Sequence, residues 1–219
     1  VEDFGTTGLR GRIDLITSKS VDDRKEDFFY FWRNIGRSNK YDDDSRGRWG
    51  LGKSVIPAAS RINSFFGFTI REDDKKRLLM GQSILKIHKL SDDTSESNPY
   101  GYFGVFDDDD EYFSLPISEE IFIDEFIIDM KLSRIDEPGL SAVIPFPDRN
   151  IRIGNLVAAS IKQYFYPILL GELVIEFVDL DGNSITLNKD NIFSESIFNY
   201  VDDEKQELSD LLIFAKSII

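Results

Sequence analysis

A chain of 219 residues with 41% hydrophobic and 13% aromatic residues can bury a sizeable core, which excludes a disordered protein. The chain has 40 acidic against 26 basic residues, and the resulting net charge of −14 argues against general binding to nucleic acid or to an anionic membrane. It has no cysteine and one histidine, which excludes thiol chemistry and leaves little for a metal site, and no apolar run approaches the roughly 20 residues of a membrane helix.

The chain opens on a carboxylate followed by glycines, DFGTTGL over residues 3–9. A carboxylate can accept a hydrogen bond from an amino-substituted ring, and glycines let the backbone approach a ligand closely. The first residues, VED, are neither a signal peptide nor a natural initiator. We therefore expect a cytoplasmic chain that begins inside a larger protein.

Residues 10–46 are polar and charge-dense, with a single aromatic run, FFYFW, at 28–32. A charged segment with one apolar handle is typical of a lid, which is mobile when open and held through the handle when shut. We expect the handle to form a short helix.

A second glycine run, GRWGLGKS over residues 47–54, satisfies the pattern of a P-loop. A P-loop needs a buried strand before its first glycine, whereas residues 40–46 read KYDDDSR. A P-loop NTPase built on Gly47–Ser54 is therefore an alternative rather than the leading interpretation. After this run, apolar residues at helical spacing predict a helix over 54–66, ended by Gly67.

The remaining patterns predict elements in two groups, with a boundary near Asp148. We expect one domain over 1–147, with the lid at about 10–46, and a C-terminal extension over 148–219. The first group contains strands over 78–90, 100–106 and 139–147, and a strand or short helix over 121–132. The second contains helices over 153–170 and from 202 onward, and a hairpin over 173–187 that turns at Asp181-Gly182.

In their order along the chain, the two glycine runs, the lid, the helix after it and the closing strand at 139–147 resemble the GHKL (Bergerat-fold) ATPases. This superfamily includes type II topoisomerases, heat-shock ATPase chaperones, histidine kinases, MutL and MORC proteins. Within it the chain is most similar to uncharacterised bacterial ATP-binding proteins. The resemblance implies an α+β fold, a Bergerat-type sandwich of helices over a mixed sheet, truncated at its N-terminus and followed by a small α/β extension.

The resemblance also implies roles for single residues. Asp3 would bind the adenine amino group, Gly5 and Gly8 would shape the wall beside the purine, and Thr6 or Thr7 would lie near it. The loop would wrap the phosphates through its backbone and add one positive charge, with the residues Gly47, Gly50, Leu51, Gly52 and Lys53. The magnesium-binding Asn and the general-base Glu of the superfamily lie before the first glycine run, so we expect no catalytic residue and no metal ligand here.

The function implied is the ATP-binding region of an ATPase that couples nucleotide binding to conformational change or dimerisation. ATP and Mg²⁺ would bind the full-length parent, and this chain alone would be inactive and bind neither. A protein partner or a self-dimer is expected. The alternative is a non-catalytic interaction module, whose acidic surface and aromatic clusters dock another protein.

Overall fold

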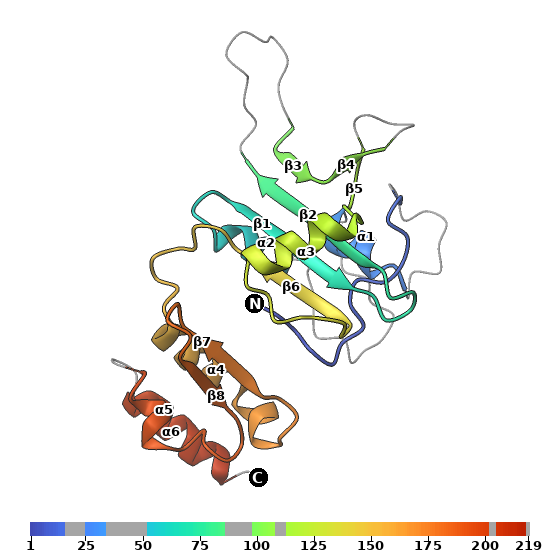
Figure 1. The fold of residues 1–219 in the computed structure, drawn as a ribbon. Coiled ribbons are helices and arrows are strands. Elements are labelled where there is room, and N and C mark those ends of the chain that lie inside the picture. The colour runs from blue at the N-terminus through green and yellow to red at the C-terminus, as the bar shows by residue number, and fades with distance from the viewer. Residues whose placement is uncertain (16–24, 34–51, 86–97, 108–112, 202–204, 218–219) are drawn as a thin grey trace. The chain divides into compact units, whose positions relative to one another are not determined.

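The computed structural model describes residues 1–15, 25–33, 52–85, 98–107, 113–201 and 205–217. The chain divides into two compact units, Val1–Pro147 and Asp148–Ile219, at the boundary where the sequence places it. Helices and antiparallel sheets are both present, so the fold is α+β (Figure 1). Each unit is described by itself.

The first unit is built on a four-stranded sheet in the order β3-β2-β1-β6. These strands are β1 (Ser64–Ile70), β2 (Arg77–Ile84), β3 (Tyr100–Phe103) and β6 (Gly139–Val143). Every strand pair in the described part of the chain is antiparallel, so the parallel pair that a mixed sheet requires is not among them. A short pair, β4 (Val105–Phe106) with β5 (Ser114–Leu115), follows β3.

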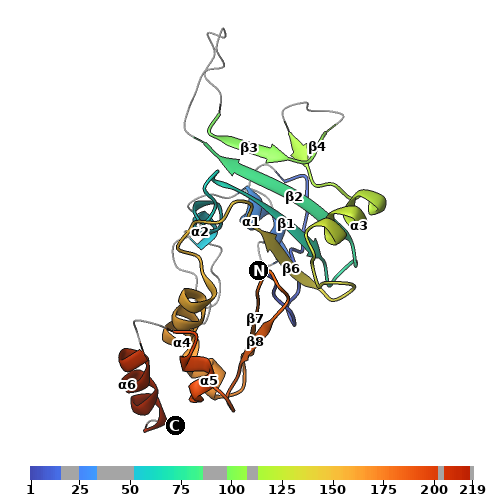
Figure 2. The same ribbon diagram turned by 60° about the vertical axis from the view of Figure 1, so that its left-hand side comes forward.

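Helices cover both faces of this sheet (Figures 1 and 2). The alternation of side chains along β1 sends Phe65 to one face and Phe66 to the other. On the face of Phe65 lie α1 (Asp27–Trp32) and α2 (Gly52–Ala58). On the face of Phe66 lies α3 (Glu120–Asp129), which buries Ile123 against β1 and β2. The core of the unit is therefore two apolar layers, one on each side of the sheet.

The aromatic handle forms a short helix, α1, as the sequence predicts, and it packs into the core of the first unit. Phe28 and Trp32 are 1% exposed, and Trp32 stacks on Phe65 with ring centroids 5.1 Å apart. Phe28, Phe29 and Trp32 thus belong to the core, although the whole of 10–46 reads as poorly core-forming. The tertiary contact with β1 gives this helix a buried site that the charged sequence around it does not suggest.

The helix expected over 54–66 is wrong in its second half. The helix ends at Ala58, a turn follows in which Asn63 has a φ of 51°, and β1 begins at Ser64. Gly67, expected to end a helix, lies inside β1 facing Trp32. Apolar residues at helical spacing from 55 to 66 belong instead to two elements with different periods.

The second unit has its own core between helices and a hairpin. Its elements are α4 (Ile153–Leu169), β7 (Ile175–Val178), β8 (Ser184–Leu187), α5 (Glu195–Phe198) and α6 (Lys205–Lys216). Ile161 of α4, Leu187 of β8 and Leu208 of α6 are fully buried in this core. The predicted hairpin and the helices on either side of it are confirmed. Within the described segments of the chain, no helix combines the length and apolar character needed to cross a bilayer.

Candidate functional site

Residues 1–3 run antiparallel along the outer edge of β6. The amide of Ala142 donates to the carbonyl of Val1 at 2.8 Å, and the amide of Asp3 donates to the carbonyl of Leu140 at 3.0 Å. Regular pairing would return a bond from the Leu140 amide to the Asp3 carbonyl. Instead, the Leu140 amide donates to Oδ1 of the Asp3 side chain at 2.5 Å. The carboxylate therefore takes the place of a main-chain acceptor.

The two oxygens of the Asp3 carboxylate differ in their hydrogen bonds. Oδ1 accepts from the Leu140 amide and from the Thr6 hydroxyl at 3.2 Å, and it lies 3.4 Å from Nη2 of Arg134. Among the described residues, every hydrogen bond to this side chain goes to Oδ1. The side chain is 49% exposed, so Oδ2 is available to a ligand.

The glycine turn after Asp3 is anchored at its far end and open in its middle. The amide of Leu9 donates to the Thr69 hydroxyl of β1, which in turn donates to the carbonyl of Gly139. Gly8 has a φ of 66°, and a methyl group there would clash with the carbonyl oxygen of Ile70. Gly5 has a φ of 72° and has no atom of another segment within 4 Å of such a group. The turn is thus held against the sheet at Gly8 and leaves space at Gly5.

A fully buried arginine, Arg134, holds the other side of this arrangement. Its Nη2 donates to the main-chain carbonyl of Asp3 and to that of Leu140 at 3.1 Å. Its Nη1 donates to the Glu137 carbonyl at 2.9 Å, and its Nε to the Ser141 hydroxyl at 3.0 Å. Burial lowers the pKa of the guanidinium, while the charges of Asp3, Glu2 and Glu137 oppose that change. The side chain is 0% exposed, and these hydrogen bonds offset the free-energy cost of burying its charge.

Glu2 completes the network around Arg134. Its Oε1 accepts from the amide and hydroxyl of Ser133 at 2.8 and 2.7 Å, and its Oε2 accepts from the Ser141 hydroxyl at 2.7 Å. Burial by itself would raise the pKa of the Glu2 carboxyl, but the hydrogen bonds from Ser133, Ser141 and Arg134 outweigh it and lower the pKa. Ser141 therefore connects the carboxylate of Glu2 to the guanidinium of Arg134.

The second glycine run is only partly within the described residues. Gly47, Gly50 and Leu51 lie outside them, as does the segment before Gly47 that the P-loop interpretation depends on. Gly52 and Lys53 are the first residues of α2. Ile56 of α2 and Leu140 beside Asp3 pack against the same apolar cluster, whose buried members are Leu9, Phe28, Trp32, Phe65, Leu78 and Met80.

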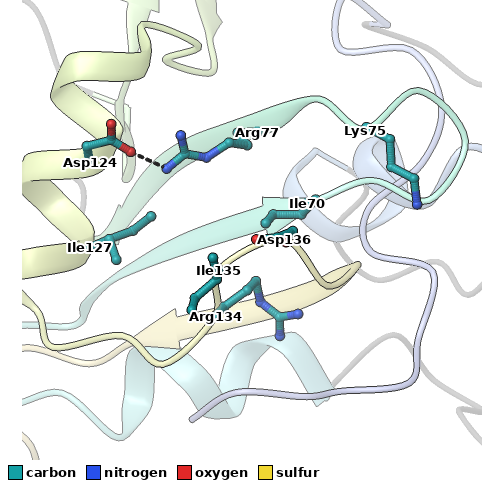
Figure 3. A pocket seen from close by; sticks show the side chains of 8 residues that line it. All are labelled: Ile70, Lys75, Arg77, Asp124, Ile127, Arg134, Ile135 and Asp136. Atoms are coloured by element: carbon teal, nitrogen blue, oxygen red, sulfur yellow. Dashed lines mark hydrogen bonds and ion pairs between the residues drawn. The ribbon is translucent and has the colours of Figure 1, made fainter.

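A cavity of about 580 Å³ lies beside α3. Its polar lining includes Arg77, which forms ion pairs with Asp124 at 2.6 Å and with Glu120. Among the described residues, none of the site residues expected from the sequence lines it. Arg134 does, and in Figure 3 its guanidinium points away from the pair formed by Arg77 and Asp124. The described residues that line it are Ile70, Lys75, Arg77, Asp124, Ile127, Arg134, Ile135 and Asp136.

The site thus contains three residues that the sequence does not mark, namely Glu2, Arg134 and Ser141. Arg134 stands in a polar loop among other charged residues, where an arginine is ordinarily exposed. The only local signal is position in the sequence. Glu2 precedes Asp3 of the glycine motif, and Ser141 follows Leu140 of the predicted closing strand. In the portion of the chain that the structure describes, no group of three or more His, Cys, Asp or Glu residues could hold a metal ion.

Comparison of the chain with protein-family models, with curated proteins and with solved structures finds no match.

Proposed function

We propose that residues 3–9 form the adenine end of an ATP site, and that this chain is the ATP-binding region of a GHKL-type ATPase. The state of the Asp3 carboxylate carries this proposal. Oδ1 is held by the amide of Leu140 and the hydroxyl of Thr6, while the half-exposed side chain leaves Oδ2 open. A carboxylate fixed in this way can accept a hydrogen bond from the 6-amino group of adenine.

The phosphate end of the proposed site is the second glycine run, from Gly47 to Lys53. Backbone amides of a glycine loop and a nearby lysine suit the oxygens of a triphosphate. The packing of α2 and of Leu140 on one apolar cluster supports the assignment of both ends to one site. We place neither a catalytic base nor a metal ligand among the described residues, and the nucleotide would bring Mg²⁺ with it.

We propose that ATP binding serves to change the conformation or assembly of the protein rather than to convert a metabolite. ATP binding would be coupled to a conformational change or to dimerisation, with a protein partner or a second copy of the chain, in the cytoplasm. A ligand can drive such a change only to the extent that it binds one state better than the other.

The test is isothermal titration of the full-length protein with ATP and Mg²⁺. Asp3→Asn replaces an acceptor with a donor and should lose ATP binding, as should Gly52→Ala. Asp14→Asn is the matched control, because Asp14 lies exposed in the same segment and pairs with Arg12 at the surface. Wild-type affinity in Asp3→Asn would show the proposal to be wrong. Dependence on Lys53 together with indifference to Asp3 would favour the P-loop alternative.

One observation favours the second candidate, a non-catalytic interaction module. Phe103, Val105 and Phe106 are exposed, and β3 pairs only with β2 among the described strands. Ile121 and Phe122 at the start of α3 are also exposed, and the ring of Phe122 lies 6.3 Å from that of Phe103. This candidate predicts that Asp3→Asn leaves the activity of the protein unchanged and that Phe106→Ser weakens binding of a protein partner.

A further inference from the structure

We infer that Arg134 is the positioning residue that sets the preference of this site for a 6-amino purine, an inference that rests on the function proposed above. It does so by deciding which oxygen of Asp3 the amide of Leu140 uses.

The geometry presents a competition between two acceptors. Val1 and Ala142 exchange both backbone hydrogen bonds, so Asp3 and Leu140, two positions along, are the next pair in register. That pair makes only one of its two regular bonds, from the Asp3 amide to the Leu140 carbonyl. The carbonyl of Asp3 is taken by Nη2 of Arg134, and the Leu140 amide turns to Oδ1 instead. Without Arg134 the regular bond can close and release the carboxylate.

Arg134 suits this role because one guanidinium nitrogen reaches three acceptors. Nη2 contacts the carbonyl of Asp3, Oδ1 of Asp3 and the carbonyl of Leu140. These are atoms of the two residues whose relative position fixes the carboxylate. Gly139 makes the approach possible, because a methyl group there would lie 2.5 Å from Nη1 and 2.6 Å from Oδ1 of Asp3. The planar fork of arginine, unlike the ammonium of lysine, can serve such divergent acceptors together.

Stability alone does not account for the arginine. Exchange of buried ionic groups for apolar side chains of similar volume is often neutral or stabilising. An arginine whose donors reach the Asp3 turn, the loop before β6 and the start of β6 is instead suited to fixing their geometry. Ser141 keeps it in place by accepting from Nε while donating to Oε2 of Glu2.

The experiment compares two ligands in the full-length protein, ATP and purine riboside triphosphate, which lacks the 6-amino group. Arg134→Met should weaken ATP binding by about three- to tenfold, the value of one hydrogen bond, and change the binding of the second ligand by less than about twofold. Loss of structure would weaken both ligands alike. Equal losses in a variant whose circular dichroism spectrum matches that of the wild type would overturn the inference and leave the proposed function standing.

A milder pair of variants covers the case in which Arg134→Met does not fold. Ser141→Ala removes the partner of Nε and should produce the same selective loss, to a smaller extent. Ser133→Ala is the control, because its hydroxyl contacts Glu2 but not the guanidinium. Equal selectivity changes in Ser141→Ala and Ser133→Ala would overturn the assignment to Arg134. Absence of ATP binding in the wild-type protein would overturn the proposed function, and this inference with it.

Discussion

Replacement of Gly67 in the sheet of the first unit should be costly. It lies inside β1 directly under Trp32, and a methyl group there would lie 2.8 Å from Cζ2 and 3.2 Å from Cη2 of that ring. The ring cannot retreat easily, because its other contacts include Phe65, stacked with an interplanar angle of 4°. Gly67→Ala should therefore force a shift of the aromatic layer.

The expected change in the free energy of unfolding of Gly67→Ala is the sum of two opposing effects. Alanine in place of glycine inside a strand stabilises by about 0.5–1 kcal/mol, and an extra methyl in a packed core costs about 1–3 kcal/mol. Gly101→Ala in β3 is the matched control, because the nearest atom to its methyl would be 3.9 Å away. The strand term cancels between the two variants, so their free energies of unfolding should differ by about 1–3 kcal/mol.

Urea unfolding followed by tryptophan fluorescence and circular dichroism measures this difference. Trp32 and Trp49 both lie within the first unit, so the fluorescence reports on that unit. In a Trp32→Phe background, which lacks both crowded ring atoms, most of the cost of Gly67→Ala should disappear. Equal stability of Gly67→Ala and Gly101→Ala would refute the reasoning.

Two further predictions concern the N-terminal turn. Because hydrogen bonds lower the pKa of Glu2 in the folded protein, its contribution to stability is present above its ordinary pKa of 4.5 and is lost as the pH falls through the folded value. Acid unfolding of Glu2→Gln should therefore be less steep below pH 4.5 than that of the exposed control Glu125→Gln. Gly5→Ala should cost about 1–2 kcal/mol for its positive φ alone, and Gly8→Ala more, because its methyl also clashes with the carbonyl of Ile70. Thermal unfolding compares the two, and a higher melting temperature for Gly8→Ala than for Gly5→Ala would contradict this account.

The sequence predicts the order of elements better than their limits. The strands β2, β3 and β6 and the helices α4 and α6 lie where alternation or helical spacing places them. The error over 54–66 arises because Phe65 and Phe66 fit a helical stripe but in fact point to opposite faces of β1. The spacing of apolar residues does not show whether an element is buried on one face or on both. Because both faces of the sheet are covered, consecutive apolar residues of β1 pack into apolar clusters, and together with those of α2 they resemble the stripe of a single helix.

The candidate site also contains residues that the sequence predicts and residues that it does not. Asp3 and its glycines carry a local signal, because the carboxylate and the glycines stand together in the chain as one motif. Arg134 carries none, since its contact with Asp3 joins residues 131 positions apart in the sequence. Long-range contacts of this kind become visible only after the edge of β6 and the loop before it are in place.

The exchange of acceptors at Leu140 has a consequence for how this protein should be dissected by mutagenesis. One amide proton both terminates the edge pairing and aims the carboxylate, so truncation of Asp3 to alanine would alter the folding of the turn and the chemistry of the site in a single step. Isosteric changes, or removal of a functional group from the ligand rather than from the protein, separate the two effects.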